Sequence, residues 1–391
     1  MKRLLLASDD YIYWSSGKYY AENRDMYNMY YRYLRVFDQL KLVSRVIEEP
    51  ELKKKRVLIE DERITIVGLP IFHGLAQYLK SYFQVEGMLQ GVCDDCDAAI
   101  LRIPSAVSYN VFHAVKKTKI PYATEVVYSA YDDYKCAQTL KEKLLEFYVD
   151  KNMKQMCNSA DGVSCVTQYY LQRQYFSKKP GAFKSYYSSA ALNDSAYSKP
   201  KEFAEKNEYT IAHVALQIMG KNGRKGHKEL IDAAMILKRR NIKVRLSFVG
   251  GDYNGGIEEL KRYAIENSII DQVDFIGFLN RDELNSYLEK ADLFVLPTKA
   301  EGLPRVILEA MAKGLPCITT NVSGNSELIQ KDLLFDFYDV DTLANKIENL
   351  LSHKEFYQDV SKRNFEKSLE YKADVLQLRR DEFYQKLYDV S

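Results

Sequence analysis

The chain has 391 residues, a length that suits two domains of ordinary size better than one. Hydrophobic residues make up 46% and charged residues 28%, which is the balance of a globular protein. Lys and Arg (56) nearly balance Asp and Glu (54), and the net charge of +2 argues against nucleic acid as a partner. No apolar run approaches the roughly 18 residues that cross a bilayer. The apolar stretch after Met1 ends at Asp9, too early for a signal peptide.

Six cysteines are spread thinly along the chain, which argues against a disulfide framework. Cys93 and Cys96 have the spacing of a metal or redox pair. No second pair follows at ligand spacing, and two ligands cannot fill a tetrahedral zinc site. We therefore expect no metal site and a reducing, cytoplasmic location.

The first half alternates short β-branched runs with helical patterns, which is typical of parallel α/β layers. Helices are predicted over residues 26–38, 72–83 and 140–157. Strands are predicted over residues 3–7, 41–47, 57–59, 64–68, 98–103, 122–127 and 162–166. Around residues 186–208 the pattern dissolves into Ser, Tyr, Ala, Lys and Pro, which favours a linker.

A second α/β series follows the linker. Its strands are predicted over residues 209–216, 244–250, 273–276, 293–297 and 316–319, and residues 343–388 are predicted to be helical. Parallel sheets bind ligands at the carboxyl ends of their strands, so two such domains can enclose two substrates in a central cleft.

The most specific pattern follows the predicted strand at 293–297 and runs Glu-Gly-Leu-Pro-Arg-Val-Ile-Leu-Glu-Ala-Met-Ala from Glu301. Pro304 stands where a helix can begin without losing a backbone donor. The free N–H groups of that helix start can seat a pyrophosphate. Glu301 and Glu309 would flank this seat and accept hydrogen bonds from the hydroxyls of a sugar and a ribose. A surface ion pair between Arg305 and Glu309 is the simpler alternative for the second glutamate.

This stretch resembles the retaining glycosyltransferases of family 4, whose mark is two Glu separated by seven residues. The resemblance continues through residues 248–252, 273–279, 291–297 and 314–320, in order and spacing. It implies an α/β chain with the GT-B fold, in which two Rossmann-like, doubly wound domains face a central cleft. The expected parts are an acceptor-side domain at 1–185, a linker at 186–208, a nucleotide-sugar-binding domain at 209–370, and a C-terminal helix at 371–391 that crosses back to the first domain.

The resemblance also implies the residues that do the chemistry. Glu301 would engage the transferred sugar, Lys225 the diphosphate and Glu309 the ribose. The other donor-binding candidates lie in the loops of the two domains: Gly302, Leu303, Pro304, Arg305, Arg224, Lys221, Phe278 and Gly17. The position of the family's phosphate-binding Arg holds Ala215, so Arg224 or Lys221 is left to supply that charge.

Two of these assignments have plain alternatives. The basic residues of the Lys221–Lys225 stretch could form a solvated turn, although a departing diphosphate needs positive charge. Gly17 is the one glycine of the loop after the first strand, and an ordinary turn explains it equally well.

Polar residues near predicted strand ends of the first half are the candidates for holding an acceptor. They are Arg102, Ser105, His113 and Glu125, and a structural role is the alternative for His113. The helical pattern over 26–38 mixes Tyr with Arg. Contact with a lipid phosphate or a membrane surface is one interpretation of it, and packing with the charges facing water is the simpler one.

Together the motifs and the resemblance imply an enzyme that moves a sugar from a nucleotide-diphosphate sugar, such as a UDP-sugar, to a glycan or lipid-linked acceptor. Transfer would retain the anomeric configuration and serve surface polysaccharide or glycoconjugate synthesis. No cofactor beyond the donor is expected to be obligatory. Peripheral contact with the inner face of the cell membrane is left open. Two alternatives also stay open: a non-catalytic nucleotide-sugar-binding subunit of a glycosylation complex, and a GT-B sugar-nucleotide epimerase.

Overall fold

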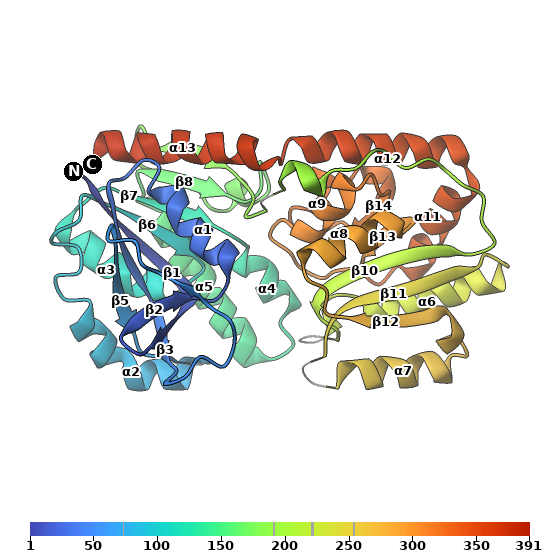
Figure 1. Ribbon diagram of the computed structural model, residues 1–391, viewed down its shortest axis with the longest axis horizontal. Coiled ribbons are helices and arrows are strands. Elements are labelled where there is room, and N and C mark those ends of the chain that lie inside the picture. Colours follow the sequence, from blue (N-terminus) through green and yellow to red (C-terminus); the bar gives the residue numbers. More distant parts are fainter. Residues whose placement is uncertain (73, 191, 220–222, 253–254) are drawn as a thin grey trace. The chain divides into compact units, whose positions relative to one another are not determined.

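The chain forms two compact units, each built on a sheet with helices on both faces (Figure 1). The computed structural model describes residues 1–72, 74–190, 192–219, 223–252 and 255–391. The first unit consists of residues 1–187 together with 377–391, and the second consists of residues 188–376. The polypeptide therefore passes from one unit to the other twice.

The sheet of the first unit has nine strands among the described residues. They are β1 (Arg3–Ser15), β2 (Lys18–Ala21), β3 (Gln39–Glu48), β4 (Val57–Leu58), β5 (Ile64–Leu69), β6 (Ala98–Ile103), β7 (Tyr122–Val126), β8 (Gly162–Cys165) and β9 (Phe183–Tyr186). The parallel part runs β5-β3-β1-β6-β7-β8-β9. β2 and β4 extend it as antiparallel strands beside the second half of β1.

β1 is longer than the sequence predicts. The predicted strand ends at residue 7, because Asp9 and Asp10 are of a type that strands avoid. The structure continues the strand to Ser15 across an irregularity in its pairing with β3, between Ala7 and Tyr11. A bulge of this kind lets a strand carry polar residues without ending.

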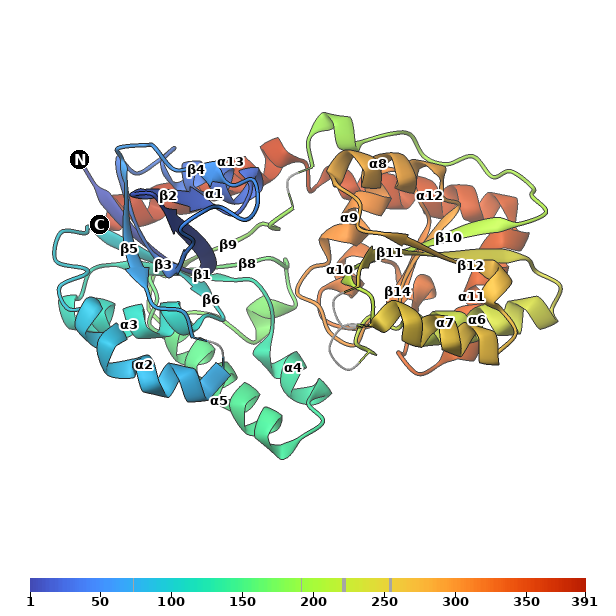
Figure 2. The same cartoon turned by 60° about the horizontal axis from the view of Figure 1, so that its bottom comes forward.

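The helices of the first unit lie on both faces of its sheet. They are α1 (Arg24–Tyr33), α2 (Gly74–Met88), α3 (Ala106–Thr118), α4 (Ala130–Cys136), α5 (Leu140–Asn158) and, from Gln377 onward, α13 (Ala373–Val390). Figures 1 and 2 both place α1 and α13 on one face and α2, α3 and α5 on the other. Phe383, Tyr384 and Leu387 of α13 are buried, so the end of the chain contributes to the core of the first unit.

The second unit is a doubly wound parallel sheet. Its strands are β10 (Tyr209–Gln217), β11 (Val244–Gly251), β12 (Val273–Gly277), β13 (Leu293–Leu296), β14 (Cys317–Thr320) and β15 (Leu334–Phe335). They lie in the order β12-β11-β10-β13-β14-β15. This is the Rossmann order 3-2-1-4-5-6, in which the winding reverses between the first and fourth strands. Here the reversal falls between β10 and β13.

Seven helices cover this sheet among the described residues: α6 (His227–Arg239), α7 (Gly256–Glu266), α8 (Arg281–Lys290), α9 (Arg305–Ala312), α10 (Asn325–Leu328), α11 (Val340–Ser352) and α12 (Lys354–Leu369). α6, α7 and α11 lie on one face, and α8, α9 and α12 lie on the other (Figures 1 and 2). The inner strands β13 and β14 are fully buried, as both faces of the sheet are covered there, whereas the edge strand β12 is only partly buried.

Candidate functional site

The loops that leave β10 and β13 meet where the second sheet reverses its winding. β10 and β13 are neighbours, with Ile211 opposite Leu293. The loop after β10 ends at Gly226, the N-cap of α6, and the loop after β13 ends at Pro304, the N-cap of α9. In doubly wound sheets the connections on the two sides of such a reversal diverge and leave room for a ligand at the carboxyl ends of the strands.

Lys225 and Glu301 are in contact at this point, through Nζ and Oε1. The hydroxyl of Thr298 donates to the same Glu301 oxygen at 3.1 Å. The backbone N–H of Glu301 donates to Ser323 Oγ at 3.3 Å. Both charged side chains are partly buried. The structure thus brings together the two residues singled out as the catalytic candidates.

The backbone holds the two loops against each other. Gly226 has φ of +63°, and a Cβ added there would come within 2.2 Å of the carbonyl oxygen of Pro297. Lys299 N–H donates to the carbonyl of Arg224 at 2.9 Å. Close approach of this kind requires a glycine and fixes the point from which Lys225 leaves the backbone.

The predicted donor residues differ in where the structure places them. Leu303 and Pro304 are buried, Arg305 is exposed, and the carbonyl of Gly302 accepts from Gly324 N–H at 3.1 Å. Glu309 is half-buried about one turn into α9. Lys221 lies outside the described residues. Pro304 caps α9 from outside rather than standing inside its first turn, and no side chain caps this helix start in the described part of the chain.

Phe278 lies beyond the carboxyl end of β12, on the same edge of the sheet. Gly277 turns the backbone there with φ of +83°. The Phe278 ring is exposed. A planar base can stack on such a ring.

Two buried histidines lie next to the loop that carries Lys225, and no motif in the sequence predicts them. The rings of His213 in β10 and His227 at the start of α6 are 4.5 Å apart between centroids. Nδ1 of His213 lies 2.9 Å from the carbonyl oxygen of Val295. Burial lowers the pKa of His213 to about 4, and burial together with the neighbouring His213 and Lys225 holds the pKa of His227 well below its usual value. Both rings are therefore neutral near pH 7.

In the first unit, Glu125 and Arg102 form part of the core instead of a polar strand end. The hydroxyls of Tyr33, Tyr187 and Tyr384 each donate to the Glu125 carboxylate at 2.8 Å. Arg102 Nε lies 3.4 Å from it. The carboxylate joins α1, α13 and the segment after β9 to the sheet, which is a structural role.

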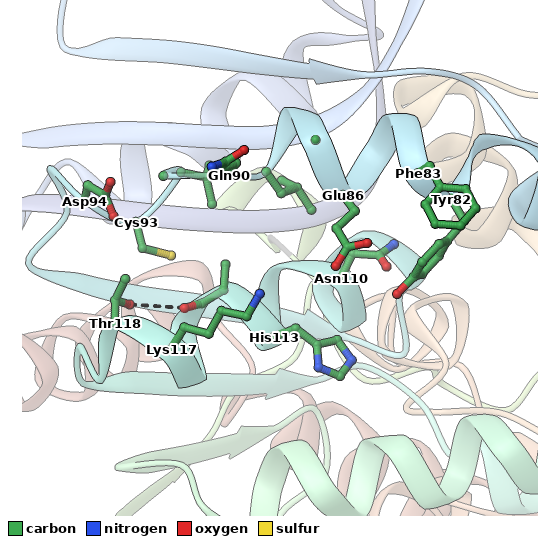
Figure 3. A pocket seen from close by; sticks show the side chains of 15 residues that line it. Tyr82, Phe83, Glu86, Gln90, Cys93, Asp94, Asn110, His113, Lys117 and Thr118 are labelled. Carbon is green, nitrogen blue, oxygen red and sulfur yellow. Dashed lines mark hydrogen bonds between the residues drawn. The ribbon is translucent and has the colours of Figure 1, made fainter.

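His113 and Gly17 also lie away from the expected ligand positions. His113 lines a pocket of about 720 Å³ between the second halves of α2 and α3, with Lys117 nearby (Figure 3). The loop before β6 forms another wall, so this pocket lies at the amino ends of the strands. Gly17 and Ser16, with φ of +78° and +47°, form the two-residue turn between β1 and β2. Such a turn needs positive φ at both positions, which accounts for the glycine.

A smaller pocket of about 310 Å³ lies at the carboxyl ends of the first sheet. Its polar wall consists of Asp9 at the irregularity of β1, Arg45 on β3 and the α3 cap Ser105. Arg45 Nη2 is 3.5 Å from Asp9 Oδ1, and Asp9 Oδ2 accepts from the N–H of Ala106 at 3.1 Å. The apolar wall includes Phe72, Tyr109, Tyr128, Leu145, Tyr148 and Met153. Of this polar wall the sequence pattern singles out Ser105 but not Asp9 or Arg45, because the predicted first strand ends before Asp9.

Neither a metal cluster nor a membrane-spanning helix is found in the part of the chain that the structure describes. No group of three or more His, Cys, Asp or Glu there could hold a metal ion. No helix formed by those residues is both long and apolar enough to cross a bilayer.

Residues 198–367, most of the second unit, match the family described as "Glycosyl transferases group 1". Over these residues the second unit is therefore similar in sequence to that family. The chain is 24% identical to "Protein CapJ" of Staphylococcus aureus over 357 aligned residues. The aligned region covers 90% of this chain and 87% of that protein.

Similarity to solved structures shows that the chain has the GT-B fold. Sucrose-phosphate synthase from Thermosynechococcus elongatus matches it over the full length of both chains, with a TM-score of 0.74 at 16% identity. The Anabaena protein Alr3699/HepE, solved in complex with UDP, matches 98% of this chain and 99% of that chain, with a TM-score of 0.66 at 16% identity.

Proposed function

We propose that the chain is a retaining glycosyltransferase that uses a nucleoside-diphosphate sugar, with a UDP-sugar as the first candidate. Its acceptor would be a glycan or a lipid-linked sugar in the synthesis of surface polysaccharide or glycoconjugate, on the cytoplasmic side of the membrane. The observation that carries the proposal is the contact between Lys225 and Glu301 at the reversal point of the second sheet. The UDP bound to the Anabaena protein supports uracil as the base to test first.

The donor would lie across the carboxyl ends of β10, β12 and β13. Lys225 and Arg224 supply positive charge to the diphosphate, next to the uncapped start of α9. Glu301 accepts hydrogen bonds from hydroxyls of the transferred sugar, and Glu309 does so from the ribose. Phe278 offers its exposed ring to the base.

Transfer would proceed through an oxocarbenium-like state. The bond between the anomeric carbon and the diphosphate oxygen breaks, and a bond to the acceptor oxygen forms on the same face of the sugar. The acceptor proton passes to the departing diphosphate. Lys225 stabilises the charge that grows on the diphosphate, so its contribution is larger in the transition state than in the bound donor.

The pocket at the carboxyl ends of the first sheet is our candidate for the acceptor. Asp9 and Arg45 in its polar wall can form hydrogen bonds, and its remaining walls are largely apolar and aromatic. Sugar acceptors are commonly held by this combination of polar groups and aromatic rings.

The test is to incubate the protein with a panel of nucleotide sugars and to identify the products. Release of nucleoside diphosphate and free sugar, or transfer to an added acceptor, is expected. Glu301→Ala should lose about 2 kcal/mol or more of transition-state stabilisation, about thirtyfold in kcat/KM. The control is Glu355→Ala, which removes an exposed carboxylate at the start of α12 and should leave the rate unchanged.

Other products would point to other functions. A sugar-nucleotide isomer in place of free nucleotide would identify an epimerase. Donor binding with no turnover by any nucleotide sugar would identify a binding subunit. Full activity in a folded Glu301→Ala variant would remove the assigned role of that carboxylate.

A further inference from the structure

The outward side of α5 is apolar. Leu140 and Phe147 keep 74% and 59% of their surface exposed, and Leu144 and Tyr148 are also at least half exposed. These positions, at i, i+4, i+7 and i+8, fall on one side of the helix. We call these four residues the α5 surface.

The opposite side of the same helix is also apolar and is packed into the first unit. Met153 and Met156 are buried there. A helix that is apolar on both sides is suited to a second apolar neighbour, because water is a poor solvent for such a stripe. Single exposed apolar side chains, by contrast, are common on protein surfaces and do not indicate a binding partner.

Lysines border the α5 surface. Lys141 and Lys143 lie at its two edges and Lys151 continues it by one turn, and all three are exposed. The three acids of the helix, Glu142, Glu146 and Asp150, are all at least half-buried. Glu142 closes the capping box with Thr139. Asp150 is buried and accepts from Tyr175 and Lys154 at 2.8 and 2.7 Å.

α4, which packs against α5, carries the same combination of groups. Tyr131 and Tyr134 are exposed and stack with centroids 6.4 Å apart. The Lys135 ammonium lies 4.4 Å from the Tyr131 ring centroid. Tyrosine and lysine side chains are suited to the lipid headgroup region, because each has an apolar body and a polar tip.

We propose that the α5 surface docks the first unit onto an anionic lipid bilayer. Leu140, Leu144 and Phe147 would enter the boundary between headgroups and acyl chains, and the bordering lysines would contact anionic headgroups. Charge complementarity selects this occupant, since a border of exposed lysines matches a uniformly negative surface. The alternative interface, helix α1, has its Tyr30 and Tyr33 buried in the core.

The position of the surface also connects it to the smaller pocket. Tyr148 belongs to both the α5 surface and the wall of that pocket, and Leu145 next to the surface lines the pocket too. If the proposed function holds, an acceptor with a lipid anchor could reach the pocket from the bilayer to which the protein is docked. Docking itself does not depend on that function.

The test is co-sedimentation of the full chain with vesicles of phosphatidylcholine containing phosphatidylglycerol, and with vesicles of phosphatidylcholine alone. We expect binding to the anionic vesicles that weakens in high salt. The double variant Leu144→Gln/Phe147→Gln should lower the bound fraction by about fivefold or more. Lys143→Gln/Lys151→Gln should weaken binding to anionic vesicles only. The matched control is Phe176→Gln/Ile265→Gln, which removes exposed apolar side chains far along the chain and should bind as the wild type does.

Donor hydrolysis and thermal unfolding of every variant show whether it is folded. Docking is overturned if the wild-type chain ignores anionic vesicles, or if the Leu144/Phe147 variant binds them normally. A wild-type dimer that the same variant converts to monomer, without vesicle binding, would assign the surface to self-association. Loss of vesicle binding in the Leu144/Phe147 variant, with donor hydrolysis retained, supports docking. A wild-type chain that binds vesicles but does not hydrolyse the donor would contradict the proposed function and leave the docking proposal standing.

Discussion

Gly226 determines how the loop after β10, which carries Lys225, packs against the loop after β13. Its φ of +63° costs a glycine little, and its missing side chain leaves room for the Pro297 carbonyl. Lys225 is the next residue toward the N-terminus, so any movement of Gly226 moves the ammonium group that contacts Glu301. The position of this charge therefore depends on a backbone contact as well as on the side-chain pair.

Gly226→Ala should reduce kcat/KM for the donor by about tenfold or more, because an added Cβ displaces the loop and with it Lys225. Steady-state kinetics and thermal unfolding check this. Gly255→Ala is the matched control, since Gly255 has a similar φ of +73° with nothing within 4 Å of an added Cβ. Equal kinetics in the two variants would mean that strain at positive φ, and not the contact with Pro297, sets the effect.

His213 and His227 make the stability of the second unit depend on pH. Burial holds the pKa of His213 at about 4, below the value near 6.5 in an unfolded chain. Between these two values the unfolded state binds more protons, so stability is present above pH 6.5 and is lost as the pH falls toward 4. His213→Asn should flatten this slope in urea unfolding measured between pH 7 and pH 4.5. An unchanged slope would assign the acid sensitivity to other groups.

At the scale of elements, α13 is held to the first unit by a buried polar network. Tyr384 donates to the Glu125 carboxylate, which also receives the hydroxyls of Tyr33 and Tyr187. Burial and the negative charge of Glu125 keep the pKa of Tyr384 well above its usual value, so the hydroxyl stays a donor. A buried carboxylate needs such donors to offset its loss of hydration.

Tyr384→Phe should lower the free energy of unfolding by about 1–3 kcal/mol, because one buried hydrogen bond to a charged acceptor is removed without changing the shape of the core. Tyr388→Phe on the same helix, where the ring is half-buried, should cost about 0.5 kcal/mol or less. Denaturant unfolding of both variants makes the comparison. A similar loss in the two would show that Glu125 does not depend on the Tyr384 hydroxyl.

The sequence predicts the buried parallel strands best. β6 has the predicted bounds, and β10 to β14 fall within a residue or so of theirs, because strands covered on both faces form unbroken apolar runs. β2, β9 and the short β15 were missed. β2 follows a hairpin turn at Ser16 and Gly17, and the apolar pattern that predicts the first strand stops at residue 7, well before this turn. β9 lies at the edge of the segment that was predicted as a linker.

The candidate site was predictable only in part. The resemblance singled out Glu301 and Lys225, 76 residues apart, and the structure places them in contact. Their roles in catalysis stay a prediction. The contribution of Thr298, the buried histidines and the Asp9–Arg45 pocket arises from strand order and bulges, which no local pattern in the sequence encodes. Glu125 was placed at a polar strand end because its buried tyrosine partners come from distant parts of the chain.

At the scale of the whole molecule, the chain passes between its units twice, after Tyr187 and within α13 before Gln377. The segment from Gln377 to Ser391 completes the first unit, and Lys2 Nζ donates to the carbonyls of Tyr388 and Ser391 at 2.6 and 2.8 Å. The two ends of the chain are therefore fixed to each other. The proposed donor residues that the structure describes, apart from Gly17, all belong to the second unit.

This separation predicts where a nucleotide will act. A ligand that binds only the folded second unit stabilises it by about 2.7 kcal/mol at a hundred times its Kd, and does nothing for a unit that it does not contact. Hydrogen exchange with and without UDP should therefore show protection in peptides that cover residues 223–227 and 298–312. Exchange in peptides of the first unit, including 377–391, should change little. Glu301→Ala controls for the sugar contact, since UDP alone lacks the sugar and should still protect that variant. Protection of equal size in residues 1–187 would mean either that the first unit also binds the nucleotide or that the two units open together. Thermal melting with and without UDP separates these explanations. A single transition in both conditions indicates that the units open together, whereas two separate transitions indicate that the first unit itself binds the nucleotide.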